Sequence, residues 1–93
     1  MQRGYHFVVT GRVQHVRFRV ATAAMARSLA LSGWVRNRPD GGVEGLVYGE
    51  DSARMQRFRD YLASGPDAAR VVAVVWEAVD EAGPPGATFS IRR

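Results

Sequence analysis

Residues 11–19 join a segment with strand character to a segment with helix character, and this junction constrains the fold most. Apolar and polar side chains alternate over residues 5–12, which is the period of a strand with one buried face. Residues 18–31 have helical spacing, and Gly33 is well placed to end that helix. A strand that leads directly into a helix leaves the first N–H groups of the helix without partners, so they can bind an anion.

The same junction is strongly basic. It contains Arg12, Arg17 and Arg19, and residues 1–39 hold seven arginines and no acidic residue. Residues 40–93 hold six arginines and nine acidic residues, so the two parts carry +7 and −3, in agreement with the net charge of +4. A guanidinium can donate two parallel hydrogen bonds to one oxyanion. The junction therefore predicts a binding site for phosphate or carboxylate.

The rest of the chain continues the alternation of strand and helix patterns. The expected elements are strands at 5–12, 34–38, 43–49, 70–79 and 88–92, helices at 18–31 and from 51 or 52 to 64, and a turn at 81–87. Asp40-Gly41 is typical of a hairpin turn, and the apolar run at 71–75 is compatible with a central strand. The order β-α-β-β-α-β, with a short final strand, predicts one α+β domain over residues 1–93. Its fold would be a ferredoxin-like sandwich, an antiparallel sheet with two helices on one face.

Periodicity also predicts which side chains are buried. The residues that share one face of each expected helix are Ala21, Met25, Ser28 and Leu29 in the first and Met55, Phe58 and Leu62 in the second. Trp34, Tyr61 and Trp76 are expected to be core or half-buried aromatics.

Composition excludes several kinds of chemistry. The 93 residues include no cysteine and no lysine, which excludes disulfides, thiolate catalysis, Schiff bases and the lysine of a nucleotide P-loop. No apolar run approaches the roughly 18 residues of a membrane span, and no secretion signal is apparent, so we expect a cytoplasmic protein without a membrane partner. No metal ligand set is predicted, because His6 has no second ligand at suitable spacing. The abundance of arginine in place of lysine suggests a bacterial, GC-rich genome.

Three motifs lie in an order and spacing that resemble the acylphosphatase family over nearly the whole chain. They are G-R-V-Q-x-V-x-F-R at 11–19, G-W-V-R-N at 33–37 and F-S-I-R at 89–92. The resemblance implies hydrolysis of the carboxyl-phosphate bond of a small acyl phosphate, giving carboxylate and phosphate, with no metal and no cofactor. It also implies that Arg19 binds the substrate phosphate and that Asn37 orients the attacking water. The loop residues expected to hold the phosphate, mainly through backbone N–H groups, are Gln14, His15, Val16, Arg17 and Phe18.

Two positions depart from the family pattern. His15 stands where the family commonly has glycine, and Arg17 stands where a small residue is frequent. If the loop requires a positive φ at position 15, a residue other than glycine costs on the order of 1–3 kcal/mol there. We expect His15 to affect loop geometry and rate more than the fold; a general base or an added phosphate donor is a second interpretation of this residue.

A binding module without catalysis is the alternative function. RNA-recognition modules have the same element order, and this chain is basic. The exposed aromatics that such modules need have Tyr5, Phe7 and Tyr48 as their candidates here, and residues 43–49 lack the usual RNA-binding signature. A small-anion-binding domain is the other version of this alternative. We therefore expect a monomeric enzyme with a small-molecule substrate and no nucleic-acid partner.

Overall fold

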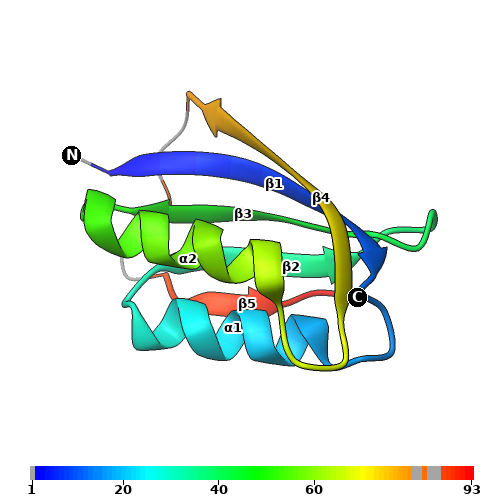
Figure 1. The fold of residues 1–93 in the computed structure, drawn as a ribbon. Helices are drawn as coiled ribbons and strands as arrows, with labels where there is room; N and C mark the ends of the chain where they lie inside the picture. The colour runs from blue at the N-terminus through cyan, green and yellow to red at the C-terminus, as the bar shows by residue number, and fades with distance from the viewer. Residues whose placement is uncertain (1, 81–82, 84–86) are drawn as a thin grey trace.

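Two helices cover one face of a five-stranded sheet in the computed structural model, which describes residues 2–80, 83 and 87–93 (Figure 1). The strands are β1 (Arg3–Arg12), β2 (Ser32–Asn37), β3 (Val43–Gly49), β4 (Arg70–Val79) and β5 (Phe89–Ile91), and the helices are α1 (Phe18–Ser28) and α2 (Ser52–Ser64). This arrangement confirms the α+β ferredoxin-like fold. The bounds of β3 and β4 agree with the predicted strands. Part of the turn predicted at 81–87 lies outside the described residues.

The sheet is mixed, so the prediction of an entirely antiparallel sheet is wrong in one pair. Its strand order is β4-β1-β3-β2-β5, and β5 runs parallel to β2 while the other neighbours are antiparallel. The physical reason is the position of the chain after β4. This strand ends beside Gly4 at the start of β1, at the end of the sheet where β2 also begins. β5 starts at that end, opposite Gly33, and so runs in the direction of β2.

The apolar strand β4 lies at an edge of the sheet, which corrects its interpretation as a central strand. Val74 and Trp76 face the core, whereas Val72 and Val75 are 81% and 46% exposed. A β-bulge interrupts the pairing with β1 between Thr10 and Gly11. The continuous apolar run therefore reflects one buried face and one exposed apolar face, which composition does not distinguish from burial on both faces.

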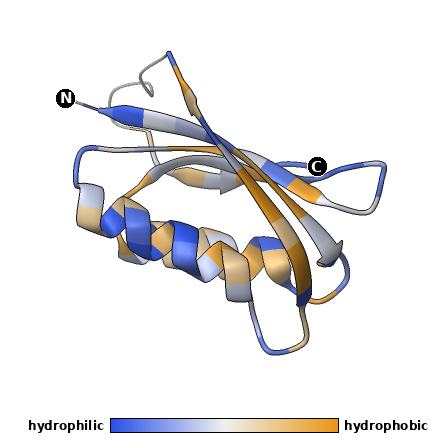
Figure 2. Cartoon of the chain, turned by 45° about the horizontal axis from the view of Figure 1, so that its top comes forward, coloured by the Kyte–Doolittle hydropathy of each residue, from blue (hydrophilic) through white to orange (hydrophobic). Residues whose placement is uncertain are grey.

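The core lies between the sheet and the helices. In β1, Phe7 and Val9 are fully buried, as the alternation predicted, and Phe7 packs edge-on against Phe58 at 5.6 Å between ring centroids. Met55, Phe58 and Leu62 are the buried residues of α2, which confirms the predicted face of that helix. In Figure 2 the helices alternate between hydrophilic and hydrophobic residues, as helices with one buried face do.

The buried face of α1 differs from the predicted one. Its buried residues are Phe18, Thr22, Ala23 and Ala26. Of the predicted face, Leu29 is buried just after the helix, Ala21 and Met25 are half-buried, and Ser28 is exposed. The helix is rich in alanine on all sides, so its apolar periodicity is weak. The large Phe18 side chain decides which face is buried, because it brings the most apolar area to the core.

α1 also ends earlier than predicted, at Ser28 and not at Leu31. Ala30 adopts a left-handed φ of 56°, and the N–H of Leu31 donates to the carbonyl of Ala26 at 2.9 Å, which is a Schellman-type end. Gly33, the predicted terminator, instead lies in β2, where its φ is 131° and a Cβ would collide with the Leu46 carbonyl of β3. That glycine permits a close approach of two strands.

Candidate functional site

The loop between β1 and α1 contains two left-handed residues that are not glycine. His15 has a φ of 61° and Arg17 a φ of 63°, on either side of Val16. The positive φ considered for position 15 is therefore present. Turns that alternate the hand of their backbone direct successive N–H groups into one concavity, a geometry that binds anions.

The start of α1 offers N–H groups to a ligand. Arg17 is the N-cap, its side chain makes no capping hydrogen bond, and the first helical bond runs from the N–H of Ala21 to the Arg17 carbonyl at 3.0 Å. Because this is the first bond of the helix, the N–H groups of Phe18, Arg19 and Val20 have no acceptor within α1. The first turn carries no acidic side chain, and the helix dipole is positive at this end. The helix start is therefore suited to an oxyanion.

A pocket of about 110 Å³ lies at this helix start and reaches the end of β2. It is lined by Val13, His15, Arg17, Phe18, Arg19, Val20 and Asn37. The structure thus brings together five of the seven predicted site residues. The side chains of Gln14 and Val16 do not line the pocket; Val16 packs against the core. The lining contains no carboxylate, so its charge is positive.

Arg19 is held by the last strand. Its Nη1 donates to the backbone carbonyl of Arg92 at 3.1 Å, and the N–H of Arg92 donates to the carbonyl of Val35 at 2.8 Å. The C-terminal end of β5 therefore fixes the Arg19 guanidinium at the pocket. Sequence reasoning missed this partner because a backbone carbonyl has no residue-specific signature.

Asn37 is half-buried and lines the other side of the pocket. It is the last residue of β2 and lies opposite Val43 of β3. Its Oδ1 is buried and has no hydrogen-bond partner within the described residues. A buried amide oxygen without a partner costs free energy, so this atom is an available acceptor at the end of β2.

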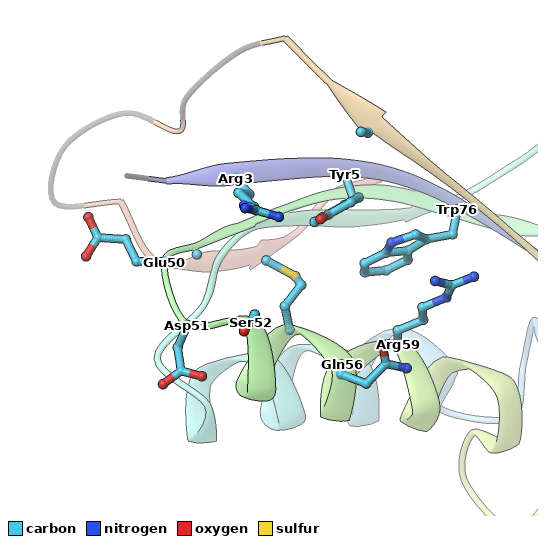
Figure 3. Close-up of a pocket in the computed structure, with 11 residues that line it drawn as sticks. Arg3, Tyr5, Glu50, Asp51, Ser52, Gln56, Arg59 and Trp76 are labelled. Carbon is cyan, nitrogen blue, oxygen red and sulfur yellow. The ribbon is translucent and has the colours of Figure 1, made fainter.

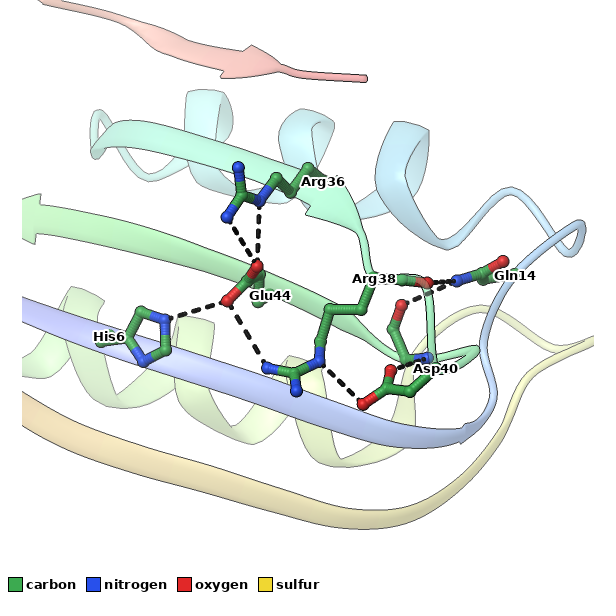
Figure 4. Close-up of polar contacts among 7 residues, drawn as sticks. His6, Gln14, Arg36, Arg38, Asp40 and Glu44 are labelled. Carbon is green, nitrogen blue, oxygen red and sulfur yellow. Dashed lines mark hydrogen bonds and ion pairs between the residues drawn. The ribbon is translucent and has the colours of Figure 1, made fainter.

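The Gln14 side chain connects the loop to the hairpin between β2 and β3 (Figure 4). Its amide nitrogen Nε2 donates to the carbonyl of Arg38 at 2.7 Å and to that of Gly42 at 2.9 Å. Gln14 thus has a contact that the sequence did not predict, and that contact lies outside the pocket.

An ion-pair network lies on the face of the sheet that the helices leave open. Glu44 of β3 accepts from Arg36 at 2.9 Å, contacts His6 at 3.3 Å and lies 3.6 Å from Arg38 (Figure 4). Burial would raise the pKa of Glu44. The hydrogen bonds from Arg36 and His6, with the charges of Arg36 and Arg38, outweigh burial and hold the pKa below its ordinary value. His6 therefore lies on the open face of the sheet and contacts the Glu44 carboxylate, a partner that the sequence did not predict.

A larger cavity of about 320 Å³ lies at the opposite end of the sheet, between β1, β4 and α2 (Figure 3). Its wall includes Tyr5 stacked on Trp76, with 4.7 Å between ring centroids, and Arg59 lies 5.5 Å from the Trp76 ring. Glu50 and Asp51 are on the same lining. Its mixed charge distinguishes this cavity from the positive pocket at the loop.

Within residues 2–80, 83 and 87–93, no group of three or more histidine, aspartate or glutamate side chains is arranged to hold a metal ion. In the same residues, no helix is long and apolar enough to cross a membrane.

Known proteins resemble this chain in both sequence and structure. The acylphosphatase family model matches residues 5–91. An acylphosphatase of Anaeromyxobacter dehalogenans is 52% identical over 85 residues, which cover 91% of this chain and 89% of the relative. One from Chromohalobacter salexigens is 46% identical over 83 residues, 89% of each chain.

Solved structures give the same result. An acylphosphatase from Coxiella burnetii superposes with a TM-score of 0.89 at 33% identity, over 98% of this chain and 93% of that one. The acylphosphatase from Bacillus subtilis superposes with a TM-score of 0.87 at 32% identity over the full length of both chains. With the family match over residues 5–91, these similarities show that the chain belongs to the acylphosphatase family.

Proposed function

We propose that this protein hydrolyses acyl phosphates to a carboxylate and inorganic phosphate at the pocket between the β1–α1 loop and the end of β2. The observation that carries the proposal is one juxtaposition. Arg19 and Asn37 line one pocket with the start of α1, the described lining holds no carboxylate, and the Asn37 Oδ1 has no hydrogen-bond partner among the described residues. Its family membership supports the same reaction.

The positive side of the pocket would bind the phosphoryl group. The N–H groups of the loop and the two-pronged guanidinium of Arg19 donate to the phosphoryl oxygens, and the dipole of α1 adds to their field. These donors are in place before substrate binds. Arg19 donates a hydrogen bond to the Arg92 carbonyl, and the loop N–H groups lie at the start of α1. Fixed donors stabilise charge that develops on phosphoryl oxygens in the transition state without a reorganisation cost.

Asn37 would orient the attacking water. Its Oδ1 accepts a hydrogen bond from one O–H of that water, which leaves a lone pair of the water oxygen directed at phosphorus. A P–O bond forms to the water oxygen, the P–O bond to the carboxylate breaks, and the leaving carboxylate takes the electron pair. The water proton passes to a phosphoryl oxygen. The pocket donors supply the positive charge of this mechanism, and no pocket side chain offers the carboxylate oxygen that Mg²⁺ prefers.

The acyl group would lie at the pocket mouth. A volume of about 110 Å³ is well below that of pockets that enclose whole ligands, roughly 300–1,000 Å³. Val20, which is 57% exposed, is the apolar side chain beside this opening. The site would therefore recognise the phosphoryl group closely and the acyl group loosely.

The geometry gives no support to an RNA-binding module. Phe7 is fully buried in the core, Tyr48 is buried, and Tyr5 is stacked on Trp76 on the helix-covered side. The three aromatic candidates for base stacking therefore do not form a platform on the open face of the sheet, which such a module needs.

Hydrolysis of benzoyl phosphate in the presence of a chelator tests the proposed function. Native protein is compared with Arg19→Ala and Asn37→Ala, and the matched controls are Arg57→Ala and Gln56→Ala on α2. We expect chelator-resistant turnover, a loss of roughly 100-fold or more in kcat/KM for Arg19→Ala, and a loss mainly in kcat for Asn37→Ala. An anion-binding domain without catalysis would bind phosphate and show no turnover, and a chelator-sensitive activity would contradict the mechanism.

A further inference from the structure

Gln14 uses both hydrogens of its amide on two carbonyls that already close the β2–β3 hairpin. The Arg38 carbonyl accepts the N–H of Gly41 at 3.2 Å, and the Gly42 carbonyl accepts the N–H of Arg38 at 2.8 Å. The Gln14 Nε2 donates to the same two oxygens at 2.7 and 2.9 Å. Each carbonyl oxygen thus receives a second donor. We use the term brace for this pair of contacts from Gln14 to the carbonyls of Arg38 and Gly42.

The brace connects two segments that strand pairing does not join, the loop after β1 and the end of β2. In the strand order β4-β1-β3-β2-β5, β3 separates β1, which leads into the loop, from β2, which ends at Asn37. No ladder therefore pairs the loop directly with the end of β2. Gln14 lies in the loop, and one of its two acceptors belongs to Arg38, the residue that follows Asn37. The brace connects the two halves of the pocket near the point where they meet.

The hairpin side of the brace is held by its own contacts. The Asp40 carboxylate accepts the N–H of Gly42 at 3.0 Å and the Arg38 Nε at 3.0 Å, and Arg38 also reaches Glu44 at 3.6 Å (Figure 4). The hydrogen bond from Gly42, with the contact to Arg38, lowers the pKa of Asp40, so the carboxylate stays ionised at neutral pH. The brace therefore links the loop to a hairpin with a defined geometry.

We propose that Gln14 is a positioning residue that sets the distance between the phosphate-binding loop and Asn37, and so aligns the attacking water with phosphorus. This inference rests on the proposed function. The phosphoryl group is held by the loop and Arg19, whereas the water is held by Asn37, so their alignment depends on how the loop and the end of β2 are joined. A misplacement of about 1 Å between reacting groups can cost on the order of 100-fold in rate.

The brace is expected to affect kcat and not the binding of phosphate. The donors that bind phosphate lie on the loop, on α1 and on Arg19, and none of them belongs to the brace. Loss of the brace is therefore expected to lower kcat and to leave the binding of phosphate nearly unchanged. A residue that bound the anion itself would change both.

The test replaces Gln14 with glutamate, which keeps the shape but removes both donors and turns a carboxylate toward two carbonyls. Gln14→Met removes the donors without adding charge. Gln56→Glu is the matched control, because the Gln56 side-chain amide donates a hydrogen bond to Asp60 on the surface of α2. For each variant, kcat and KM with benzoyl phosphate, the inhibition constant of inorganic phosphate and the thermal midpoint are measured.

We expect Gln14→Glu and Gln14→Met to lose roughly tenfold to 100-fold in kcat, while the inhibition constant of phosphate changes less than about threefold. Gln56→Glu should retain native kcat. In an Asn37→Ala background the kcat effect of Gln14→Glu should shrink several-fold, because the group being aligned is absent.

Three results overturn the inference. Native kcat in both Gln14 variants, with a lower thermal midpoint, would make the brace a stability feature. A rise in the phosphate inhibition constant in proportion to the loss of kcat would place Gln14 in anion binding. If Gln14→Glu lowers kcat by the same factor in the native and the Asn37→Ala backgrounds, Gln14 acts on a group other than Asn37. If native protein does not turn over benzoyl phosphate, the proposed function itself fails, which differs from failure of the brace in an active enzyme.

Discussion

The Arg19 guanidinium donates to the backbone carbonyl of Arg92 at 3.1 Å, which joins the start of α1 to the end of β5. The contact spans nearly the whole chain, and β5 in turn is paired with β2, the strand that ends at Asn37. Arg19, through its side chain, and Asn37, through the backbone of β2, are thus both attached to the β2–β5 side of the sheet. Arg92 also places its guanidinium 4.6 Å from the ring centroid of Trp34, which anchors the residue on the open face.

Arg19→Lys is expected to weaken phosphate binding although it preserves the charge. Lysine lacks the planar pair of donors, and an ammonium on a flexible chain cannot contact the Arg92 carbonyl and hold a phosphoryl group in the same fixed geometry. We expect KM for benzoyl phosphate and the inhibition constant of phosphate to rise about tenfold to 100-fold, as for the loss of a charged hydrogen bond of about 1.5–3 kcal/mol. Steady-state kinetics measure both, with Arg57→Lys on α2 as the control. Unchanged constants would mean that charge suffices at position 19.

A β-branched residue at position 15 is expected to destabilise the fold. His15 has a φ of 61°, a region that histidine tolerates and valine does not. We expect His15→Val to lower the free energy of unfolding by roughly 1–2 kcal/mol, and His15→Gly to change it by less than about 1 kcal/mol. Urea unfolding followed by tryptophan fluorescence measures this, with Arg12→Val at the end of β1 as control. Equal stability of the valine and glycine variants would show that the loop does not impose this φ.

Glu44→Gln is expected to remove a pH-dependent part of the stability. The pKa of Glu44 lies below its ordinary value of 4.5 in the folded protein, so the folded state favours the ionised form. The contribution is therefore present above about pH 4.5 and is lost as the pH falls through the folded-state pKa. The difference in free energy of unfolding between native protein and Glu44→Gln should be largest near pH 7 and smallest near pH 3.

Urea unfolding at several pH values measures this difference. Asp40 and Asp51 also have lowered pKa values, so both proteins lose stability in acid, and the comparison between them isolates Glu44. Asp40 owes its shift first to the N–H of Gly42, and Asp51 owes its shift first to the N–H of Arg54. A difference that stays constant from pH 7 to pH 3 would contradict the role of the ionised Glu44.

Phe58→Ala is expected to be the most destabilising of these substitutions. Phe58 is fully buried and contacts the rings of Phe7, Trp76 and Phe89 at centroid distances of 5.6, 6.4 and 5.9 Å. Truncation of a core phenylalanine costs about 3–5 kcal/mol, through lost burial and the cavity that remains. Denaturant unfolding measures the loss, and Val72→Ala, at an 81% exposed position, should change stability by less than about 0.5 kcal/mol. A loss below about 1 kcal/mol at Phe58 would mean that the core closes around the missing ring.

Local patterns predicted the elements that strong local signals define. Asp40-Gly41 placed the hairpin, the spacing of Met55, Phe58 and Leu62 gave the buried face of α2, and Asp51 caps α2 by accepting the N–H of Arg54 at 3.0 Å. Such signals act within a few residues, where the chain is connected. The alanine-rich α1 has a weak signal, and there both the end of the helix and its buried face were predicted wrongly.

In the candidate site, too, the sequence predicted some features and missed others. The arginine-rich, acid-free junction selected Arg19 as an anion-binding candidate, and the resemblance of the motif at 33–37 to the family selected Asn37 as the water-orienting candidate. The role of Gln14 was not predicted, since its acceptors are backbone carbonyls of the β2–β3 hairpin, which any residue could supply. The contact of Arg19 with the Arg92 carbonyl was not predicted for the same reason.

The sequence by itself determined the order of strands and helices, the positive charge of the loop and the residue types able to bind phosphate and orient water. The tertiary structure decided that β5 runs parallel to β2, that β4 lies at an edge, and that Asn37 Oδ1 is buried with no hydrogen-bond partner among the described residues. The physical reason is the difference between interactions that are local in the sequence and interactions that are distant in it. Local conformation follows from neighbours along the chain, whereas strand pairing, burial and the meeting of two loops depend on contacts between segments far apart, which form together when the core closes.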